Sequence, residues 1–393
     1  MVSILPFAAW RPSASEAGTF ACPPYDVLTR EEATELAPNH RFLRVTRPEV
    51  GLAPEISEDD LQAHSLARSE LERFKAEGVL AQDPRPQLYA YRETMGDAVQ
   101  TGIVACVLVA DYESGVIKRH ERTLVAKQKN RTEHFKATGA HTEPVFLTYR
   151  RRAQIDELVA AATQGEPEVR VSDGAGVIHE LWPIAAPEPI VAAFEAVEAF
   201  YIADGHHRSA SAAAAAGAGD EGFMAVIFPD SDLTVMSYNR AVHTLGDLSP
   251  RDLLDKLGES FAVTKMEDPD QWTPRERGSF GMWLAGEWYL LEYKGEPSGD
   301  AVADLDVSIL QNTVLSPLLG IEDPRTDSRI SFLGGIAGRD ALAELAGENG
   351  VAFALYPTSV AEIMAISDAG EIMPPKSTWF EPKLISGLFI HEM

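Results

Sequence analysis

One short segment near the middle of the chain combines residue types that bind and transform phosphates. An apolar run, 199–203, is followed by a polar cluster and then by an alanine-rich stretch of high helix propensity. The cluster consists of Asp204, Gly205, His206, His207, Arg208 and Ser209. This order predicts a strand, a tight turn and the first turn of a helix.

Each residue type in this cluster suits an anion site. The first turn of a helix has backbone N–H groups without partners and carries partial positive charge. Gly205 lets the backbone come close to a ligand, and Arg208 offers a planar fork of donors for phosphate oxygens. Asp204 and the two histidines, His206 and His207, add acid–base or metal-binding capacity. The alternative is a helix cap in which Asp204 and Arg208 form an i, i+4 ion pair.

A second cluster, unusually basic for so acidic a chain, lies at 119–131. Residues 124–138 are expected to be helical, so Lys127 and Arg131 share one face and could clamp phosphates. Just before this helix, His120 could contact substrate and Glu121 could act as a general base. The alternative is a solvated basic face, which is what most charge runs are.

The remaining candidates occupy loops and strand ends and could bind substrate. They are Tyr25 and Asp26 in a Pro-Pro-Tyr-Asp-Val segment, Asn239 and Arg240, and Lys376 and Thr378 in a proline-rich C-terminal segment. The competing interpretation is a packed turn for the first pair and a tail docked on the core for the last pair.

Composition narrows the class of protein. The chain has 393 residues and a formal net charge of -26, which disfavours nucleic acid as a partner. Two cysteines are too few for a disulfide framework, and no signal peptide or membrane-spanning apolar run is evident. We therefore expect a cytoplasmic protein with no membrane partner. The sequence has neither a Walker A motif nor a convincing dinucleotide-binding glycine motif.

Helices and short strands mix without strict alternation, which predicts a mixed α/β (α+β) fold. Strands are expected at 42–46 and, as a hairpin, at 88–91 and 101–111. A second hairpin is expected at 223–238. The best domain boundary lies near 247, dividing a site-bearing N-terminal region, 1–247, from a C-terminal α/β region, 248–393.

The same clusters resemble a known family. In order along the chain, the segments 23–27, 119–123, 204–208, 238–240 and 374–383 resemble the bacterial domain of unknown function family 1015. Asp204 to Arg208 is also distantly similar to the phosphate motif of the ParB/sulfiredoxin superfamily, which includes nucleotide switches and free-serine kinases. The resemblance implies a ParB/sulfiredoxin-like core with added α/β elements at both ends.

The resemblance also implies roles. Asp204 to Arg208 would hold the phosphates of ATP, ADP or pyrophosphate together with Mg²⁺, and Asp204 would be the metal ligand. Glu121 would be the base, with Asp204 or His206 as the other catalytic candidates. His206 stands where sulfiredoxin chemistry would need a cysteine, and no helix-turn-helix follows the motif.

These inferences predict a small-molecule kinase, most concretely a free L-serine kinase, that binds a small substrate and a phosphoryl donor. The sequence also leaves open a homodimer. The alternative is a ParB-like nucleotide switch without turnover. A third hypothesis is that the histidine pair forms a structural zinc site or a hydrogen-bond knot.

Overall fold

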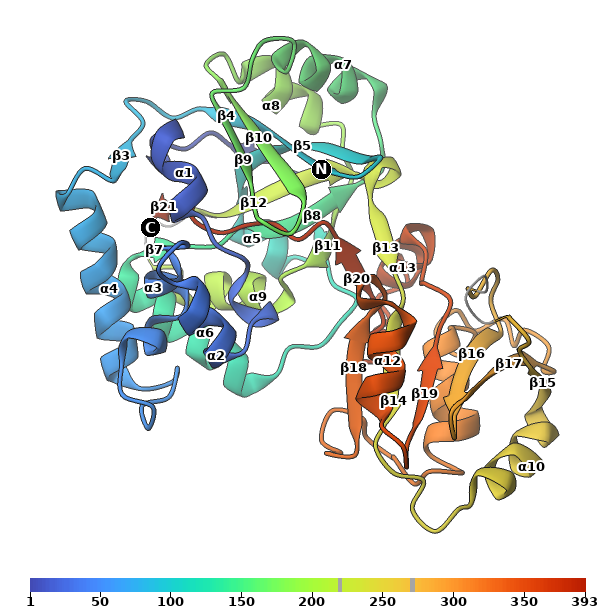
Figure 1. Ribbon diagram of the computed structural model, residues 1–393. Coiled ribbons are helices and arrows are strands. Elements are labelled where there is room, and N and C mark those ends of the chain that lie inside the picture. Colours follow the sequence, from blue (N-terminus) through green and yellow to red (C-terminus); the bar gives the residue numbers. More distant parts are fainter. Residues whose placement is uncertain (218–220, 269–272) are drawn as a thin grey trace. The chain divides into compact units, whose positions relative to one another are not determined.

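The computed structural model describes residues 1–217, 221–268 and 273–393, which form two compact units (Figure 1). The first unit contains 1–234 and the last residues, Pro382–Met393, and the second contains Val235–Glu381. The chain thus enters the second unit before the expected boundary at 247, and its end returns to the first. Among the described residues, every helix is too short or too polar to span a bilayer.

A nine-stranded mixed sheet organises the first unit. Its strands, in spatial order, are β6 (Ile117–Lys118), β11 (Phe200–Asp204), β8 (Val145–Tyr149), β12 (Gly222–Pro229), β5 (Ala98–Leu108), β4 (Leu88–Met95), β10 (Val177–Ile184) and β9 (Val169–Ser172), with β1 (Ile4–Leu5) beside β5. Among the strand pairs of the described residues, β6–β11 and β8–β12 are parallel and the others in this sheet are antiparallel. All eight residues of β12 are buried, as expected for a strand covered on both faces.

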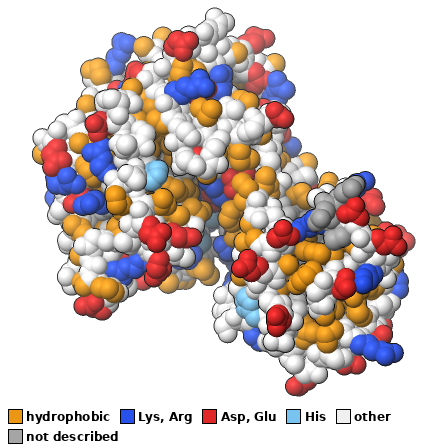
Figure 2. Space-filling view, in the orientation of Figure 1, with side chains coloured by type: hydrophobic (Ala, Val, Ile, Leu, Met, Phe, Trp, Pro, Cys, Tyr) orange, Lys and Arg blue, Asp and Glu red, His pale blue; other side chains and the backbone are white. Residues whose placement is uncertain are grey.

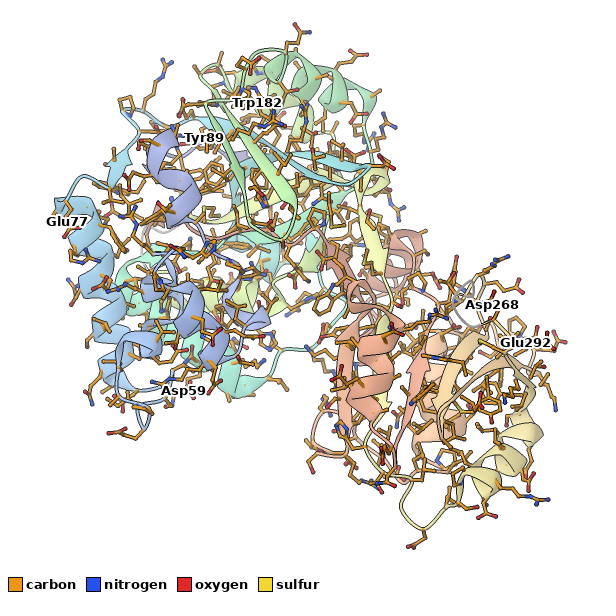
Figure 3. The ribbon with its side chains drawn as sticks, in the orientation of Figure 1. Asp59, Glu77, Tyr89, Trp182, Asp268 and Glu292 are labelled. Carbon is orange, nitrogen blue, oxygen red and sulfur yellow. The ribbon has the colours of Figure 1, made fainter. Side chains whose placement is uncertain are left out.

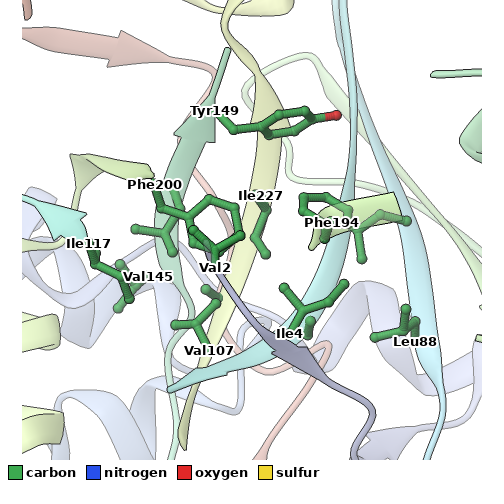
Figure 4. Close-up of a cluster of buried hydrophobic side chains, with 14 of the residues drawn as sticks. Val2, Ile4, Leu88, Val107, Ile117, Val145, Tyr149, Phe194, Phe200 and Ile227 are labelled. Atoms are coloured by element: carbon green, nitrogen blue, oxygen red, sulfur yellow. The ribbon is translucent and has the colours of Figure 1, made fainter. Parts of the chain in front are cut away.

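The first unit also contains helices. They are α1 (Ala14–Phe20), α2 (Arg30–Leu36), α3 (Leu43–Thr46), α4 (Leu61–Ala76), α5 (Val109–Glu113), α6 (Val125–Thr138), α7 (Ala153–Ala162), α8 (Glu188–Phe194) and α9 (His206–Ala215). The main core joins the sheet to α7 and α8; Figure 4 shows Phe194 of α8 among strand residues such as Leu88 and Ile227. A second core packs α1, α3 and α4 through Phe20, Phe42 and Phe74.

Two small two-stranded sheets complete the first unit. β2 (Trp10–Pro12) pairs with β3 (Leu80–Gln82), and β7 (Ala140–His141) pairs with β21 (His391–Glu392). The second pairing attaches the C-terminal strand to the segment that follows α6.

The second unit has a six-stranded antiparallel sheet. Its order is β15 (Phe261–Lys265), β17 (Glu287–Tyr293), β16 (Ser279–Leu284), β19 (Val351–Ala354), β14 (Tyr238–Val242) and β18 (Ile330–Gly334). Its helices are α10 (Pro250–Ser260), α11 (Asp306–Leu310), α12 (Gly338–Ala346) and α13 (Val360–Asp368), and β13 (Thr234–Met236) pairs with β20 (Trp379–Glu381). In α10 and α13 a serine and an acidic residue form a capping box, which specifies the helix start.

The mixed α/β class is confirmed, and so are the hairpin β4–β5 and the helix at 125–138. Two local predictions are wrong. Residues 43–46 form α3 instead of a strand, because Phe42, Leu43 and Val45 all pack into the helical core while Arg44 faces solvent. The predicted hairpin at 223–238 does not form: β12 lies between β5 and β8, and β13 pairs with β20.

The acidic balance of the chain is visible on its surface. On the face drawn in Figure 2, Asp and Glu side chains are spread over both units and alternate with Lys and Arg. This distribution gives no broad basic surface on that face for a polyanion.

Candidate functional site

The turn predicted to carry the chemistry joins β11 to α9. Gly205 occupies the N-cap position of α9 with φ 91°, a left-handed conformation that glycine adopts without strain. Because glycine has no side chain, it cannot cap the amides of the first turn. Asp204 and His207 are half-buried, while Gly205 and His206 are buried. A ligand can therefore approach this turn at Asp204 and His207.

Arg208 is turned into the protein. Its guanidinium donates to the Pro144 carbonyl and lies 3.3 Å from Asp204 Oδ2, and the side chain is 2% exposed. Ser209 is also buried, and its hydroxyl donates to the Gly205 carbonyl. The predicted phosphate contacts of these two side chains are therefore not supported: both are used to shape the turn, and the i, i+4 ion pair proposed as the alternative is present.

Replacing Gly205 with Ala should test how closely the turn depends on this packing. A Cβ at position 205 would lie 3.0 Å from Arg208 Nε. An alanine there would also have to adopt the positive φ of Gly205. Gly176, with φ 95° and open space around its Cβ position, is a matched control. The φ penalty is about 1–2 kcal/mol at either site. We expect Gly205→Ala to lower the thermal midpoint more than Gly176→Ala; an equal loss would show that the Arg208 contact is unimportant.

Asp204 lies between two cations. Lys383 Nζ is 3.5 Å from its Oδ2, and Arg208 approaches the same oxygen. Burial alone raises the pKa of the Asp204 carboxyl, but Lys383 and Arg208 outweigh it and hold that pKa well below its usual range. Asp204 is therefore a weak base.

The same geometry disfavours Asp204 as the ligand of Mg²⁺. The carboxylate is already neutralised by two fixed positive charges, which would repel an added cation. The residues around Asp204 are therefore better suited to bind an anion than to bind Mg²⁺.

Glu121 and His120 meet the start of α9. Ligand atoms of His120, Glu121 and His206 all lie within 4.8 Å of one another. The His120 amide donates to His206 Nε2 at 3.4 Å, although the two residues are 86 positions apart, and their rings form a T-shaped pair with centroids 4.4 Å apart. The Leu124 amide donates to His207 Nε2 at 2.9 Å, which attaches the loop before α6 to the same turn.

Both facing histidines are neutral. Burial lowers the pKa of His120 to about 4. Burial, reinforced by the neighbouring His120, lowers the pKa of His206 well below its usual value. Glu121 is only partly buried, so its carboxylate is the group of the three that a substrate can reach.

Arg131 does not face a ligand. It is 1% exposed and bonds Glu143 Oε2 at 3.2 Å and the Thr46 carbonyl at 3.3 Å. Its guanidinium lies 4.2 Å from the Tyr25 ring centroid, and the Tyr25 amide donates to Glu143. The prediction that Lys127 and Arg131 together clamp phosphate is therefore not supported, because only Lys127 is exposed.

A cavity of about 320 Å³ adjoins the buried contacts of Arg131, and Tyr25 belongs to both. It is lined by Tyr25, Asp26, Leu28, Arg47, Glu58, Asp59, Ala126, Lys127 and Asn130. Figure 3 labels Asp59, whose carboxylate accepts from Asn130 Nδ2 at 2.6 Å. The cavity unites three of the predicted residues, Tyr25, Asp26 and Lys127, and its volume suits a small metabolite.

The other four candidates belong to the second unit. Arg240 is buried and donates to the Tyr238 and Pro375 carbonyls, and Asn239 Oδ1 accepts from the Leu355 amide. Lys376 Nζ lies 5.3 Å from the Tyr238 ring centroid. These contacts are structural, and substrate binding by these residues and by Thr378 stays a prediction.

Two residues at the site were absent from the sequence-based candidates. Lys383 falls in a segment noted for its resemblance, but only the return of the C-terminus to the first unit brings it to Asp204. Glu143 and the nearby His141 give only a weak metal-binding signal in the sequence, because a lone glutamate before a strand is common. The role of Glu143 depends on Arg131 and Tyr25, which approach it from other parts of the chain.

Comparisons with solved structures give only remote similarity. SbnI with a C-terminal truncation from Staphylococcus aureus is 12% identical, with 73% of this chain and 87% of that chain covered and a TM-score of 0.41. A free serine kinase in complex with AMP is 14% identical (71% and 86% covered, TM-score 0.36), and a conserved hypothetical protein from Pyrococcus furiosus is 14% identical (76% and 98%, TM-score 0.38). No curated protein matches the chain.

The family model is more informative than these structures. The model described as a protein of unknown function, DUF1015, matches residues 4–308. That range includes the whole Asp204–Ser209 turn, the His120–Glu121 pair and the Tyr25–Asp26 segment. The chain therefore belongs to the DUF1015 family.

Proposed function

We propose that this protein is a phosphotransferase that acts on a small hydroxy amino acid, with free L-serine as the most concrete acceptor. One observation carries the proposal: Glu121 lies within reach of the β11–α9 turn, so a carboxylate able to take a proton meets a helix N-terminus able to face a phosphate. Because Lys383 and Arg208 hold the pKa of Asp204 low, Asp204 is poorly suited to take the proton, and we assign that role to Glu121.

Phosphoryl transfer needs positive charge and positioning more than covalent help from the protein. Lys383 and the amides at the start of α9 supply positive charge beside Asp204. Arg208 contributes by holding Asp204 and the turn in place. Magnesium would enter with the donor's phosphates, with the nucleotide or pyrophosphate supplying oxygen ligands.

The cavity beside Tyr25 is our candidate for the acceptor pocket. Asp26, Glu58 and Asp59 give it an acidic wall suited to an ammonium group, and Lys127 adds a cation suited to a carboxylate. An amino acid carries both charges. We therefore expect a neutral alcohol to be a poorer acceptor than serine.

Two buried polar atoms near this region support a functional role. The Tyr25 hydroxyl and Arg208 Nε are two of the buried polar atoms that have no hydrogen-bond partner among the described residues. Unsatisfied buried polar groups are uncommon and concentrate where a ligand or a rearrangement completes them.

The direct test is to incubate the protein with L-serine and Mg²⁺ and with ATP, ADP or pyrophosphate in separate reactions. Phosphoserine should form with at least one donor and should be detected by mass spectrometry. Threonine, homoserine and ethanol serve as acceptor controls. Absence of phosphorylated product with every donor and amino acid would overturn the proposal.

A nucleotide switch without turnover is the second candidate. The burial of Arg131 and Arg208 favours it, because these guanidinium groups cannot then reach the oxygens of a transition state. A switch would bind a nucleoside triphosphate saturably, and bound nucleotide would remain unhydrolysed over hours.

A further inference from the structure

The cluster at His120, Glu121 and His206 has the composition of a metal centre. Two imidazoles and one carboxylate approach within 4.8 Å of one another at the junction of the loop after β6 and the start of α9. We propose that these three residues bind a divalent transition-metal ion, most plainly Zn²⁺. Its presence would be independent of the Mg²⁺ that accompanies a phosphoryl donor.

The ligand types decide between metals. Mg²⁺ prefers oxygen ligands and retains water, so it gains little from two imidazoles. Zn²⁺ and Fe²⁺ sites commonly use two histidines and one carboxylate and leave further positions open. Zn²⁺ is favoured here because three ligands plus one open position complete its usual tetrahedron.

The geometry needs only small side-chain adjustments. Ligand atoms about 2.1 Å from a tetrahedral ion lie about 3.4 Å from one another. The three ligand atoms already lie within 4.8 Å, and the 3.4 Å contact from the His120 amide to His206 Nε2 is long enough for an ion to displace.

The surroundings hold the ligands ready. His120 is 1% exposed and His206 is 6% exposed, and burial favours the neutral imidazole that binds metal. The bond from the Leu124 amide to His207 holds the loop that carries Glu121 against α9. Glu121 is partly exposed, so the open coordination positions would face the side from which a ligand arrives.

The proposal that these three residues bind a metal ion does not depend on the proposed kinase activity. Only a catalytic use of the bound ion rests on that function. An ion with open positions could bind the acceptor hydroxyl or a phosphate oxygen and lower the pKa of that hydroxyl. Glu121 would then contribute one oxygen to the ion.

The test measures binding and requires no turnover. The full-length protein is stripped with a chelator and dialysed against one equivalent of Zn²⁺, and its metal content is measured by mass spectrometry. Co²⁺ loading then reports the ligand set through its visible absorption. We expect one ion per chain, retained in excess Mg²⁺, and a dissociation constant raised at least about 100-fold in His120→Ala and His206→Ala.

Glu121→Gln serves as a second variant in case a histidine variant misfolds, because the side chain is half-exposed and the change keeps its size. It should also weaken Zn²⁺ binding. His243→Ala, in the second unit, is the matched control and should bind normally. Equal metal content in all variants, loss of binding in Asp204→Asn but not in the histidine variants, or displacement of the ion by Mg²⁺ would overturn the proposal. A protein that binds Zn²⁺ as expected but never yields phosphoserine would refute the kinase function and leave the metal site intact.

Discussion

Glu121→Gln is expected to lower the rate of phosphoserine formation by about 10²–10⁴-fold, the usual contribution of a general base. Glutamine keeps the size of the side chain but cannot accept a proton. Nucleotide affinity should change little, because glutamine keeps an oxygen in place of the carboxylate at the turn that carries His206. Steady-state kinetics and calorimetric binding of the nucleotide, performed on the same preparation, check both parts.

Glu133→Gln is a suitable control, since Glu133 lies on α6 with its side chain about half-exposed, where it faces Lys136 at 3.6 Å. It should retain full activity. Adding excess Zn²⁺ separates two roles of Glu121: partial recovery would indicate a ligand, and no recovery would indicate a base. Normal turnover of Glu121→Gln would contradict the role of Glu121 as base and any catalytic use of a metal ion held there.

Arg131→Met is expected to destabilise the first unit by about 3–5 kcal/mol, the cost of leaving one member of a buried ion pair alone. Glu143 is 1% exposed and would keep hydrogen bonds from the Tyr25 amide at 3.2 Å and the Ser386 hydroxyl at 3.5 Å, with Arg208 as its remaining cationic neighbour. Urea unfolding followed by hydrogen exchange at amides of β12 reports the first unit separately from the second.

The double variant Arg131→Met with Glu143→Gln should recover part of this loss, because it removes both charges. Lys127→Met, in the exposed first turn of the same helix, should change the unfolding free energy by less than about 0.5 kcal/mol. A double variant as unstable as the single one would show that the aromatic contact with Tyr25, and not the ion pair, provides the stability.

Glu121→Gln tests a chemical role and Arg131→Met tests a structural role, although both residues belong to the same basic cluster of the sequence, 119–131. Arg131 and Lys127 were predicted to share a helix face and a ligand. They lie one helical turn apart on the same face, but the first turn of α6 is exposed, whereas residues 130–132 in the next turn are buried where α6 packs against α4 and α9. Helical spacing showed that the two residues were near each other, but only the neighbours of α6 determined which one meets solvent.

The sequence by itself determined the local elements at the site. The apolar run 199–203 predicted the strand β11, and the alanine-rich stretch after Gly205 predicted the helix α9. The segment rich in lysine and arginine predicted α6. These features depend on residues close together in the chain, where propensity and glycine geometry act directly.

Tertiary structure decided the rest, because the site is assembled from segments that are distant in sequence. It placed His120 and Glu121 against His206, returned Lys383 to Asp204, and turned Arg208 and Arg131 toward carboxylates in the interior. A long side chain takes the direction that satisfies its charge at the least desolvation cost. That balance depends on packed neighbours that no local pattern of residues specifies.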